Sequence, residues 1–66
     1  MDVNGEKIKA IREEREKTQD CIAEAAGRTR KWVQLVEQGK LVKLNRNIAL
    51  AIARRLNCRL EDIAKG

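Results

Sequence analysis

The stretch TQDCIAEAAGRTRKWVQLVEQGK, in the middle of the chain, constrains the fold more than any other part of the sequence. Its composition favours helix on both sides of Gly27, and glycine readily adopts the left-handed conformation that ends a helix. Thr18 and Thr29 stand where N-cap residues are expected, because a threonine hydroxyl can accept a free backbone N–H. The sequence therefore predicts a sharply bent pair of short helices, over residues 19–26 and 30–38.

The bend has the packing pattern of a helix-turn-helix, in which two helices meet at about 90–120° through a short turn. A small residue is needed where the helices cross, and Ala23 lies one turn before Gly27. The second helix needs an apolar anchor, and the spacing of Val33 and Val36 places them on one face. Such a pair leaves its outward face free to enter the DNA major groove. The alternative is a plain helical hairpin inside a bundle.

The rest of the chain is also helical in character, and we predict an all-α fold of five helices in one domain, residues 1–66. There is no proline, one aromatic residue and no strand-type alternation. A core of this size supplies only about 3–5 kcal/mol. The expected elements are a first helix over residues 5–16 with Val3, Ile8 and Ile11 on its apolar side, a third helix ended by Gly39, a fourth helix capped by Asn45 and ended by Asn57, and a short fifth helix carrying Leu60 and Ile63.

Several classes of protein are disfavoured by what the sequence lacks. There is no apolar run long enough to span a membrane, and the first residues do not resemble a signal peptide. The chain has no histidine and only two cysteines, Cys21 and Cys58, which are too few for a zinc site. We expect a cytoplasmic protein with reduced thiols, Cys58 in the core, no metal and no cofactor. Without histidine, clustered carboxylates or a phosphate-binding glycine loop, we do not expect an enzyme.

The net charge of +5 is concentrated after the bend. Residues 27–47 carry six Lys/Arg and one Glu, a balance of +5, whereas residues 1–26 carry five Lys/Arg and seven Asp/Glu, a balance of −2. A basic patch confined to one segment is typical of a surface that binds phosphates. The alternatives are a solvated basic face or a basic membrane-surface helix. The second is disfavoured because the apolar helix faces are needed for the core.

Three stretches resemble the lambda-repressor-like DNA-binding family, also described as Cro/cI or XRE: IKAIREEREKTQDCIAEAAG, WVQLVEQGK and IARRLNCRLEDI. The resemblance covers nearly all of residues 5–63. It implies a compact five-helix DNA-binding domain with the helix-turn-helix at the second and third helices. It also implies an ion pair between Arg12 of the first helix and Glu37 of the third. The chain departs from the family pattern at Lys17, Arg28, Leu44, Arg46 and Arg59.

The same resemblance implies a transcriptional regulator similar to Cro-like or restriction–modification controller proteins. Members of the family bind as two-fold dimers to half-sites about one helical turn apart. We expect the homodimer surface at the fifth helix and the end of the fourth, with Leu60 and Ile63 among its contacts. A DNA-binding antitoxin, or a protein-interaction module of the same fold, is the alternative function. A purely protein-binding face would be apolar, and the third helix instead carries Arg30, Lys31 and Gln34.

The third helix supplies the candidates for reading base edges, because the first turns of a recognition helix reach into the major groove. Arg30 and Lys31 could contact guanine, and Gln34 could contact adenine. Leu35 could contact a thymine methyl or, equally, be a core or dimer contact. Trp32 is expected to pack rather than to contact DNA. The candidates for DNA backbone contacts, which position a protein without specifying sequence, are Gln19, Arg28, Thr29, Gln38, Lys40, Lys43 and Arg46.

Overall fold

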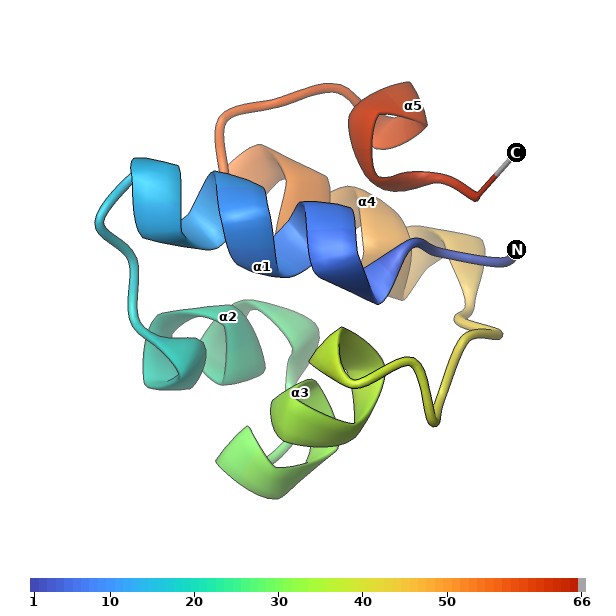
Figure 1. Cartoon of the computed structure of the whole chain (residues 1–66), viewed down its shortest axis with the longest axis horizontal. Helices are drawn as coiled ribbons and strands as arrows, with labels where there is room; N and C mark the ends of the chain where they lie inside the picture. The colour runs from blue at the N-terminus through green and yellow to red at the C-terminus, as the bar shows by residue number, and fades with distance from the viewer. Residues whose placement is uncertain (66) are drawn as a thin grey trace.

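The computed structural model describes residues 1–65, which form five helices and no β-sheet (Figure 1). The helices are α1 Gly5–Glu14, α2 Gln19–Ala26, α3 Arg30–Glu37, α4 Arg46–Arg55 and α5 Leu60–Ile63. The all-helical prediction is confirmed for the described residues. None of these helices is both long enough and apolar enough to cross a membrane.

Helices α1 to α4 each begin at a residue whose side chain accepts a backbone hydrogen bond. The hydroxyl oxygens of Thr18 and Thr29 accept from the amides three residues further on, at 3.1 and 3.2 Å. At the start of α4, Asn45 Oδ1 accepts from the Asn47 amide at 2.8 Å. At the start of α1, Asn4 Oδ1 accepts from the Lys7 amide at 3.2 Å. The caps predicted at Thr18, Thr29 and Asn45 are confirmed, and caps of this kind typically contribute about 1 kcal/mol each.

The helix ends follow from residues in the left-handed conformation. Gly27 has a φ of 67°, Gly39 of 78° and Asn57 of 58°, so the three predicted stops are confirmed. Helix α1 ends two residues earlier than predicted, because Glu16 itself takes a φ of 56° and turns the chain toward α2. Helix α3 ends one residue earlier than predicted, with Gln38 as its C-cap.

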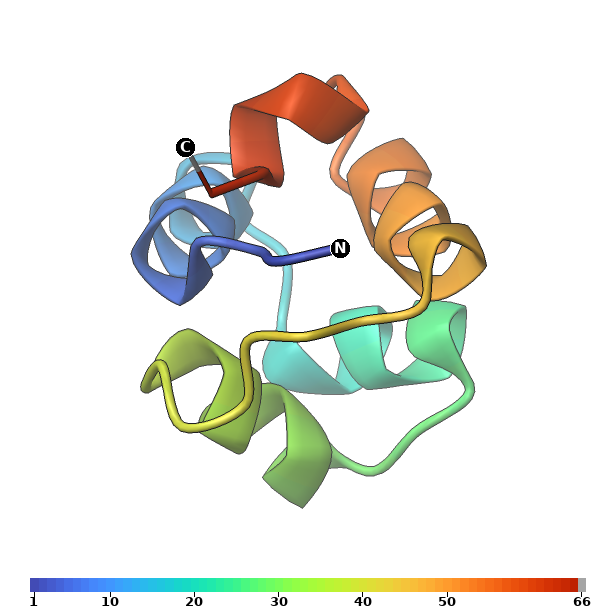
Figure 2. The ribbon, with the colours of Figure 1, turned by 90° about the vertical axis from the view of Figure 1, so that its right-hand side faces the viewer.

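The core is shared by all five helices. Figure 1 shows α1 in front of α4, with α2 and α3 below and α5 above, and Figure 2 shows α1 and α4 on opposite sides of the molecule. The largest fully buried side chains are Val3, Ile8, Ile22, Val33, Val36, Ile52, Leu56 and Ile63. Burying a side chain of this size stabilises a fold by about 1.5–3 kcal/mol. The anchor predicted for α3, Val33 and Val36, is therefore confirmed as part of the core.

The first four residues form an extended segment that the sequence did not predict. Val3 N–H donates to the Val42 carbonyl at 2.9 Å, and Asn4 N–H donates to the Ile63 carbonyl at 2.8 Å. Figure 2 shows this segment passing between the loop that follows α3 and the end of the chain beyond α5. Val3 was expected on the apolar side of the first helix, which is wrong. It reaches the core from this extended segment instead.

The short helix α5 faces the core rather than solvent. Ile63 is fully buried, so its prediction as a dimer contact is wrong: the side chain is already used inside the monomer. Leu60 is partly buried and packs against the core. At the start of α5, Arg59 stands where a capping serine is common. Its N–H donates to the Asp62 carboxylate at 2.9 Å.

Candidate nucleic-acid interface

Helix α3 is buried along one side and open along the other. Val33, Val36 and Glu37 are buried, with at most 8% of each residue exposed. Their i, i+3, i+4 spacing places them on one face of the helix. Arg30 and Lys31, in the first turn, are both exposed. The helix is thus fixed along the face that carries Val33, Val36 and Glu37, while Arg30 and Lys31 of its first turn face solvent.

The buried end of α3 is tied to α1 by the predicted ion pair between Arg12 and Glu37. Arg12 Nε lies 2.7 Å from Glu37 Oε2, and Nη2 lies 3.2 Å from Oε1. The third nitrogen, Nη1, donates to the Lys17 carbonyl at 3.0 Å. The two side chains are only 11% and 4% exposed. The hydrogen bond to Glu37 raises the pKa of Arg12 above its ordinary value despite the opposing effect of burial.

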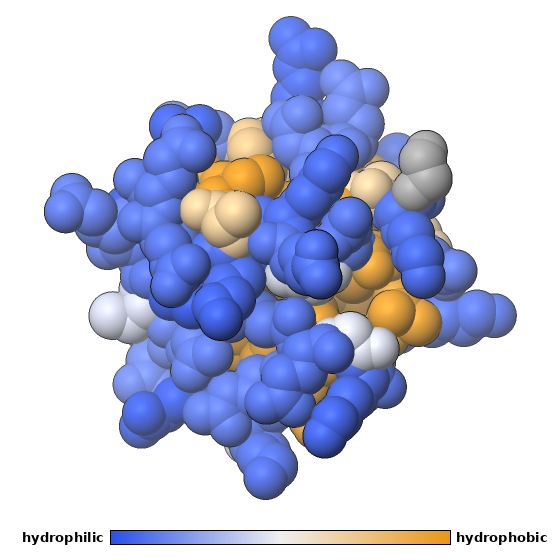
Figure 3. All heavy atoms as spheres, in the orientation of Figure 1, coloured by the Kyte–Doolittle hydropathy of each residue, from blue (hydrophilic) through white to orange (hydrophobic). Residues whose placement is uncertain are grey.

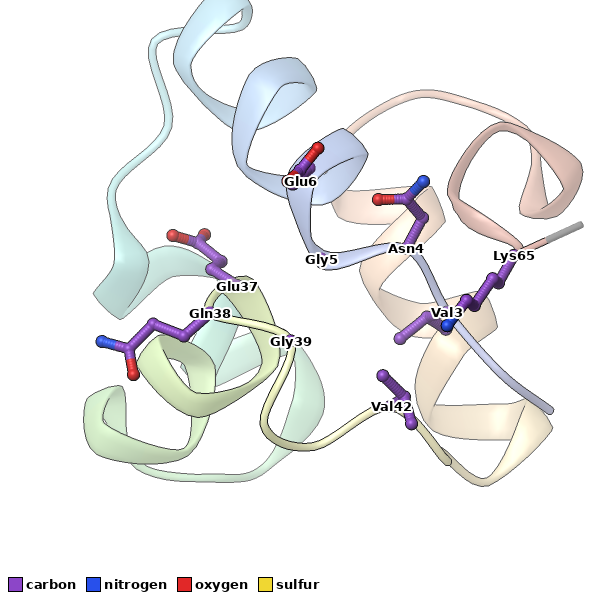
Figure 4. A pocket seen from close by; sticks show the side chains of 9 residues that line it. All are labelled: Val3, Asn4, Gly5, Glu6, Glu37, Gln38, Gly39, Val42 and Lys65. Atoms are coloured by element: carbon purple, nitrogen blue, oxygen red, sulfur yellow. The ribbon is translucent and has the colours of Figure 1, made fainter.

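A second contact between α1 and α3 depends on a glycine that sequence reasoning missed. Gly5 is buried at the start of α1, and a Cβ there would collide with the Val36 carbonyl oxygen and lie 3.0 Å from Glu37 Cα. Figure 4 shows Gly5 beside the end of α3, at the edge of a shallow pocket of about 290 Å³. A glycine at the first position of a helix, where a stronger helix former would be expected, was the available signal.

The glutamine expected on the DNA backbone joins the same buried cluster. Gln19 Nε2 donates to Glu37 Oε1 at 3.1 Å, and Gln34 Nε2 donates to Gln19 Oε1 at 3.4 Å. Both glutamines are partly buried. Glu37, at the end of α3, therefore binds both Arg12 of α1 and Gln19 at the start of α2, and Gln34 joins the cluster through Gln19. Three of the predicted base-reading residues carry a polar or charged group, Arg30, Lys31 and Gln34, and of these only Gln34 is partly buried.

An open hollow lies where α2 begins, next to the first residue of α3. It is lined by Arg12, Lys17, Thr18, Gln19, Asp20 and Arg30. The first amides of a helix have no partner within the helix and favour an anion. Within the hollow, Arg30 Nε lies 3.0 Å from Asp20 Oδ1, and the two side chains are 61% and 67% exposed. Asp20 was not among the predicted site residues.

The other predicted DNA contacts are open to solvent or nearly so. Leu35 is partly buried. Thr29 is exposed, and its hydroxyl oxygen already caps α3. The exposed side chains predicted to meet the DNA backbone are Arg28, Thr29, Gln38, Lys40, Lys43 and Arg46. They come from the turn before α3, from the end of α3, from the loop after Gly39 and from the first residue of α4.

Trp32 and Cys58 behave as the sequence indicated. Both are partly buried and pack against the core, so the packing predictions are confirmed. Burial is the largest cause of a raised pKa for the Cys58 thiol, with a further contribution from the nearby Asp62 charge. A thiol with a raised pKa is a poorer nucleophile at neutral pH. Cys58 therefore acts as a filler of the core edge.

A second arginine contact, missed by sequence reasoning, ties α4 to α2. Arg55 Nη1 donates to the Cys21 carbonyl at 3.1 Å, and it lies 3.4 Å from Cys21 Sγ and 3.5 Å from Glu24 Oε1. The hydrogen bond to Cys21 is the largest cause of a raised pKa for Arg55. These residues lie more than thirty positions apart, so no local pattern signals the contact.

Within residues 1–65, no group of three or more acidic, cysteine or histidine side chains is placed to hold a metal ion. No protein-family model, curated protein or solved structure matches the chain. The assignment of function therefore depends on the geometry of α2 and α3 and on the exposed basic residues around them.

Proposed function

We propose that this chain is a sequence-specific regulator of transcription that binds double-stranded DNA, with α2 and α3 as a lambda-repressor-like helix-turn-helix. The observation that carries the proposal is the division of α3 into a buried face and an open face whose first turn presents Arg30 and Lys31 to solvent. Side chains that read DNA need a rigid support. The Arg12–Glu37 pair and the close approach at Gly5 supply it at the far end of α3.

The size of α3 suits the major groove. A helix with its side chains is about 10–12 Å in diameter, which matches the roughly 12 Å width of the groove, and the eight residues of α3 give it about two turns. In this proposal Arg30 and Lys31 contact the O6 and N7 acceptors of guanine. Leu35 lies one turn further on and contacts a thymine methyl. Gln34 donates one N–H of its side-chain amide to Gln19, so it contacts adenine with the other N–H and the amide oxygen.

The exposed basic residues around α3 would hold the DNA backbone. Arg28 lies before α3, and Lys40 and Lys43 lie in the loop after it. Arg46 and the exposed Gln38 and Thr29 complete the proposed set, with Gln19 reaching a phosphate at the start of α2. Each Lys or Arg that neutralises a phosphate releases condensed counterions, so binding should weaken steeply as salt rises.

The proposal includes a two-fold dimer on a palindromic operator, because a single recognition helix covers only a few base pairs. Among the described residues the only large apolar side chain that is exposed is Met1. The face in Figure 3 is covered mostly by hydrophilic side chains, with small and separate apolar areas. Ile63 lies in the core, which leaves Leu60 as the predicted contact in α5. We therefore expect weak self-association in solution and pairing on DNA.

The test is selection of bound duplexes from a random pool, followed by affinity measurements on selected and scrambled duplexes at several salt concentrations. We expect inverted half-sites about 10 base pairs apart and a preference over scrambled DNA of at least about 10³-fold. One protein per selected duplex would remove the dimer from the proposal. A pool that yields no consensus, with equal binding to scrambled DNA, would show that the basic surface is a non-specific anion-binding face.

The alternative is a binding module of the same fold whose α3 meets a protein, alone or as a DNA-binding antitoxin. An α3 built for a protein groove would be expected to expose apolar anchors. The exposed first turn of α3 is instead cationic, at Arg30 and Lys31. This charge is why we place DNA first.

A further inference from the structure

We propose that Asp20 is a specificity-determining residue: its carboxylate orients the Arg30 guanidinium so that the arginine selects guanine over the other bases. The inference deepens the proposed function and rests on it. Asp20 lies in the first turn of α2, and Arg30 is the first residue of α3. The pair therefore spans the two helices of the proposed helix-turn-helix, on the side where its base-reading turn lies.

The contact leaves a definite part of the guanidinium available. The short distance of 3.0 Å joins Asp20 Oδ1 to the Nε atom of Arg30. Arginine carries five N–H donors in a fixed planar fork, and four of them belong to the two Nη atoms. With Nε held on Asp20, the end of the fork formed by the Nη atoms is directed away from the carboxylate. This end matches the paired O6 and N7 acceptors of guanine, which adenine and the pyrimidines do not present.

The position of Asp20 is unfavourable for simple phosphate binding. It places a carboxylate inside the hollow lined by Arg12, Lys17 and the start of α2, where the other charged groups attract anions. The basic segment of residues 27–47 contains a single acid, Glu37, and that residue is buried and bonded to Arg12. Asp20 is thus the exposed acid among the proposed DNA contacts. The competing explanation is that it only complements the positive end of the α2 dipole.

The pair contributes little to folding, since both side chains are mostly exposed and such pairs add little to stability. Its removal therefore changes binding without unfolding the protein. If Asp20 orients Arg30, the Asp20→Ala variant loses guanine preference because the guanidinium is free to rotate. The same variant gains affinity for DNA of unrelated sequence, because one negative charge is removed from a phosphate-facing surface. The two effects have opposite signs.

The experiment uses a duplex selected by the parent protein, single-base variants of it and a scrambled duplex. For Asp20→Ala we expect a loss of about two- to fivefold in guanine preference at one base pair per half-site, the range set by an exposed ion pair. Binding to the scrambled duplex should increase, most at low salt. Glu24→Ala is the matched control. Glu24 is an exposed acid of α2 that pairs with Arg55 rather than with α3, so guanine preference should stay unchanged.

A double-mutant cycle completes the test. In an Arg30→Ala background, Asp20→Ala should have no further effect on guanine preference, because the residue it orients is gone. If Asp20→Ala gained affinity equally on guanine-containing and scrambled duplexes, Asp20 would act only through its negative charge, and the inference would be overturned. Loss of guanine preference in Glu24→Ala would overturn it as well. A parent protein that does not distinguish selected from scrambled DNA overturns the proposed function, and this inference with it.

Discussion

The two ends of α3 each carry an arginine–carboxylate pair, and the two pairs differ mainly in their surroundings. At the C-terminal end, Arg12 and Glu37 are 11% and 4% exposed and meet at two points. At the N-terminal end, Arg30 and Asp20 are 61% and 67% exposed and meet at one. A buried charge that loses its partner is costly, whereas an exposed one is solvated by water. The same chemistry therefore stabilises the fold at one end and leaves an arginine available for binding at the other.

The largest expected effect is on stability and lies at the buried end. Arg12→Ala leaves Glu37 buried without its cation, which should lower the free energy of unfolding by about 3–5 kcal/mol. Arg30→Ala should change it by less than about 1 kcal/mol because its pair is exposed. Urea denaturation of the two variants and the parent measures both values. Equal stability of Arg12→Ala and Arg30→Ala would remove the distinction between the two ends.

A second prediction asks whether the buried end depends on backbone contact as well as on charge. Gly5→Ala places a methyl group against the Val36 carbonyl, and the clash involves backbone that cannot rotate away. Overpacking of this kind should cost about 1–3 kcal/mol. Thermal unfolding measures it, with Ala10→Gly as a control for ordinary helix propensity at an exposed site of α1. If Gly5→Ala is as stable as the parent, the close approach of α1 to the end of α3 adds nothing measurable to the ion pair and the buried valines.

A third prediction concerns DNA binding at the exposed end, where stability should barely change. Arg30→Ala should cost about 1–3 kcal/mol on the selected duplex and relax preference at one base pair per half-site. Lys31→Ala should behave similarly at its own base pair. Lys43→Ala, in the loop after α3, should weaken binding to all sequences alike and reduce the salt slope by about one unit.

Fluorescence anisotropy on selected and scrambled duplexes separates the two kinds of variant. If Lys43→Ala alone altered sequence preference, while both α3 variants lost affinity equally on the two duplexes, the roles assigned to these residues would have to be exchanged.

Local features of the fold were predictable from the sequence, and contacts between distant residues mostly were not. The caps at Thr18 and Thr29 and the stop at Gly27 follow from residues a few positions apart, so short patterns reveal them. The Arg12–Glu37 pair spans 25 positions, and it was expected only because the sequence resembles a known family. The buried position of Gly5, the Asp20–Arg30 pair and the Arg55–Cys21 contact had no such guide.

Helix α5 shows a different reason for an incorrect prediction. Leu60 and Ile63 have the spacing of an apolar helix face, and the pattern alone does not say whether the monomer or a partner covers that face. The structure assigns Ile63 to the core, where it meets the first residues of the chain through the Asn4 amide and its own carbonyl. Sequence periodicity correctly identified Ile63 as a buried apolar residue, but it was wrongly assigned to a surface between two protomers rather than to the core of one.

The extended segment before α1 has a consequence for how the molecule is made. Its hydrogen bonds join Val3 to Val42 and Asn4 to Ile63, whereas each helix needs only neighbours within one turn. Helices can form while the chain is still emerging from a ribosome. The bond from Asn4 has to wait until residue 63 has been synthesised, and closing so long a loop costs entropy that the local helices do not. The Asn4 amide is therefore a natural reporter of completed folding, and its hydrogen exchange should follow opening of the whole domain rather than fraying of a single helix.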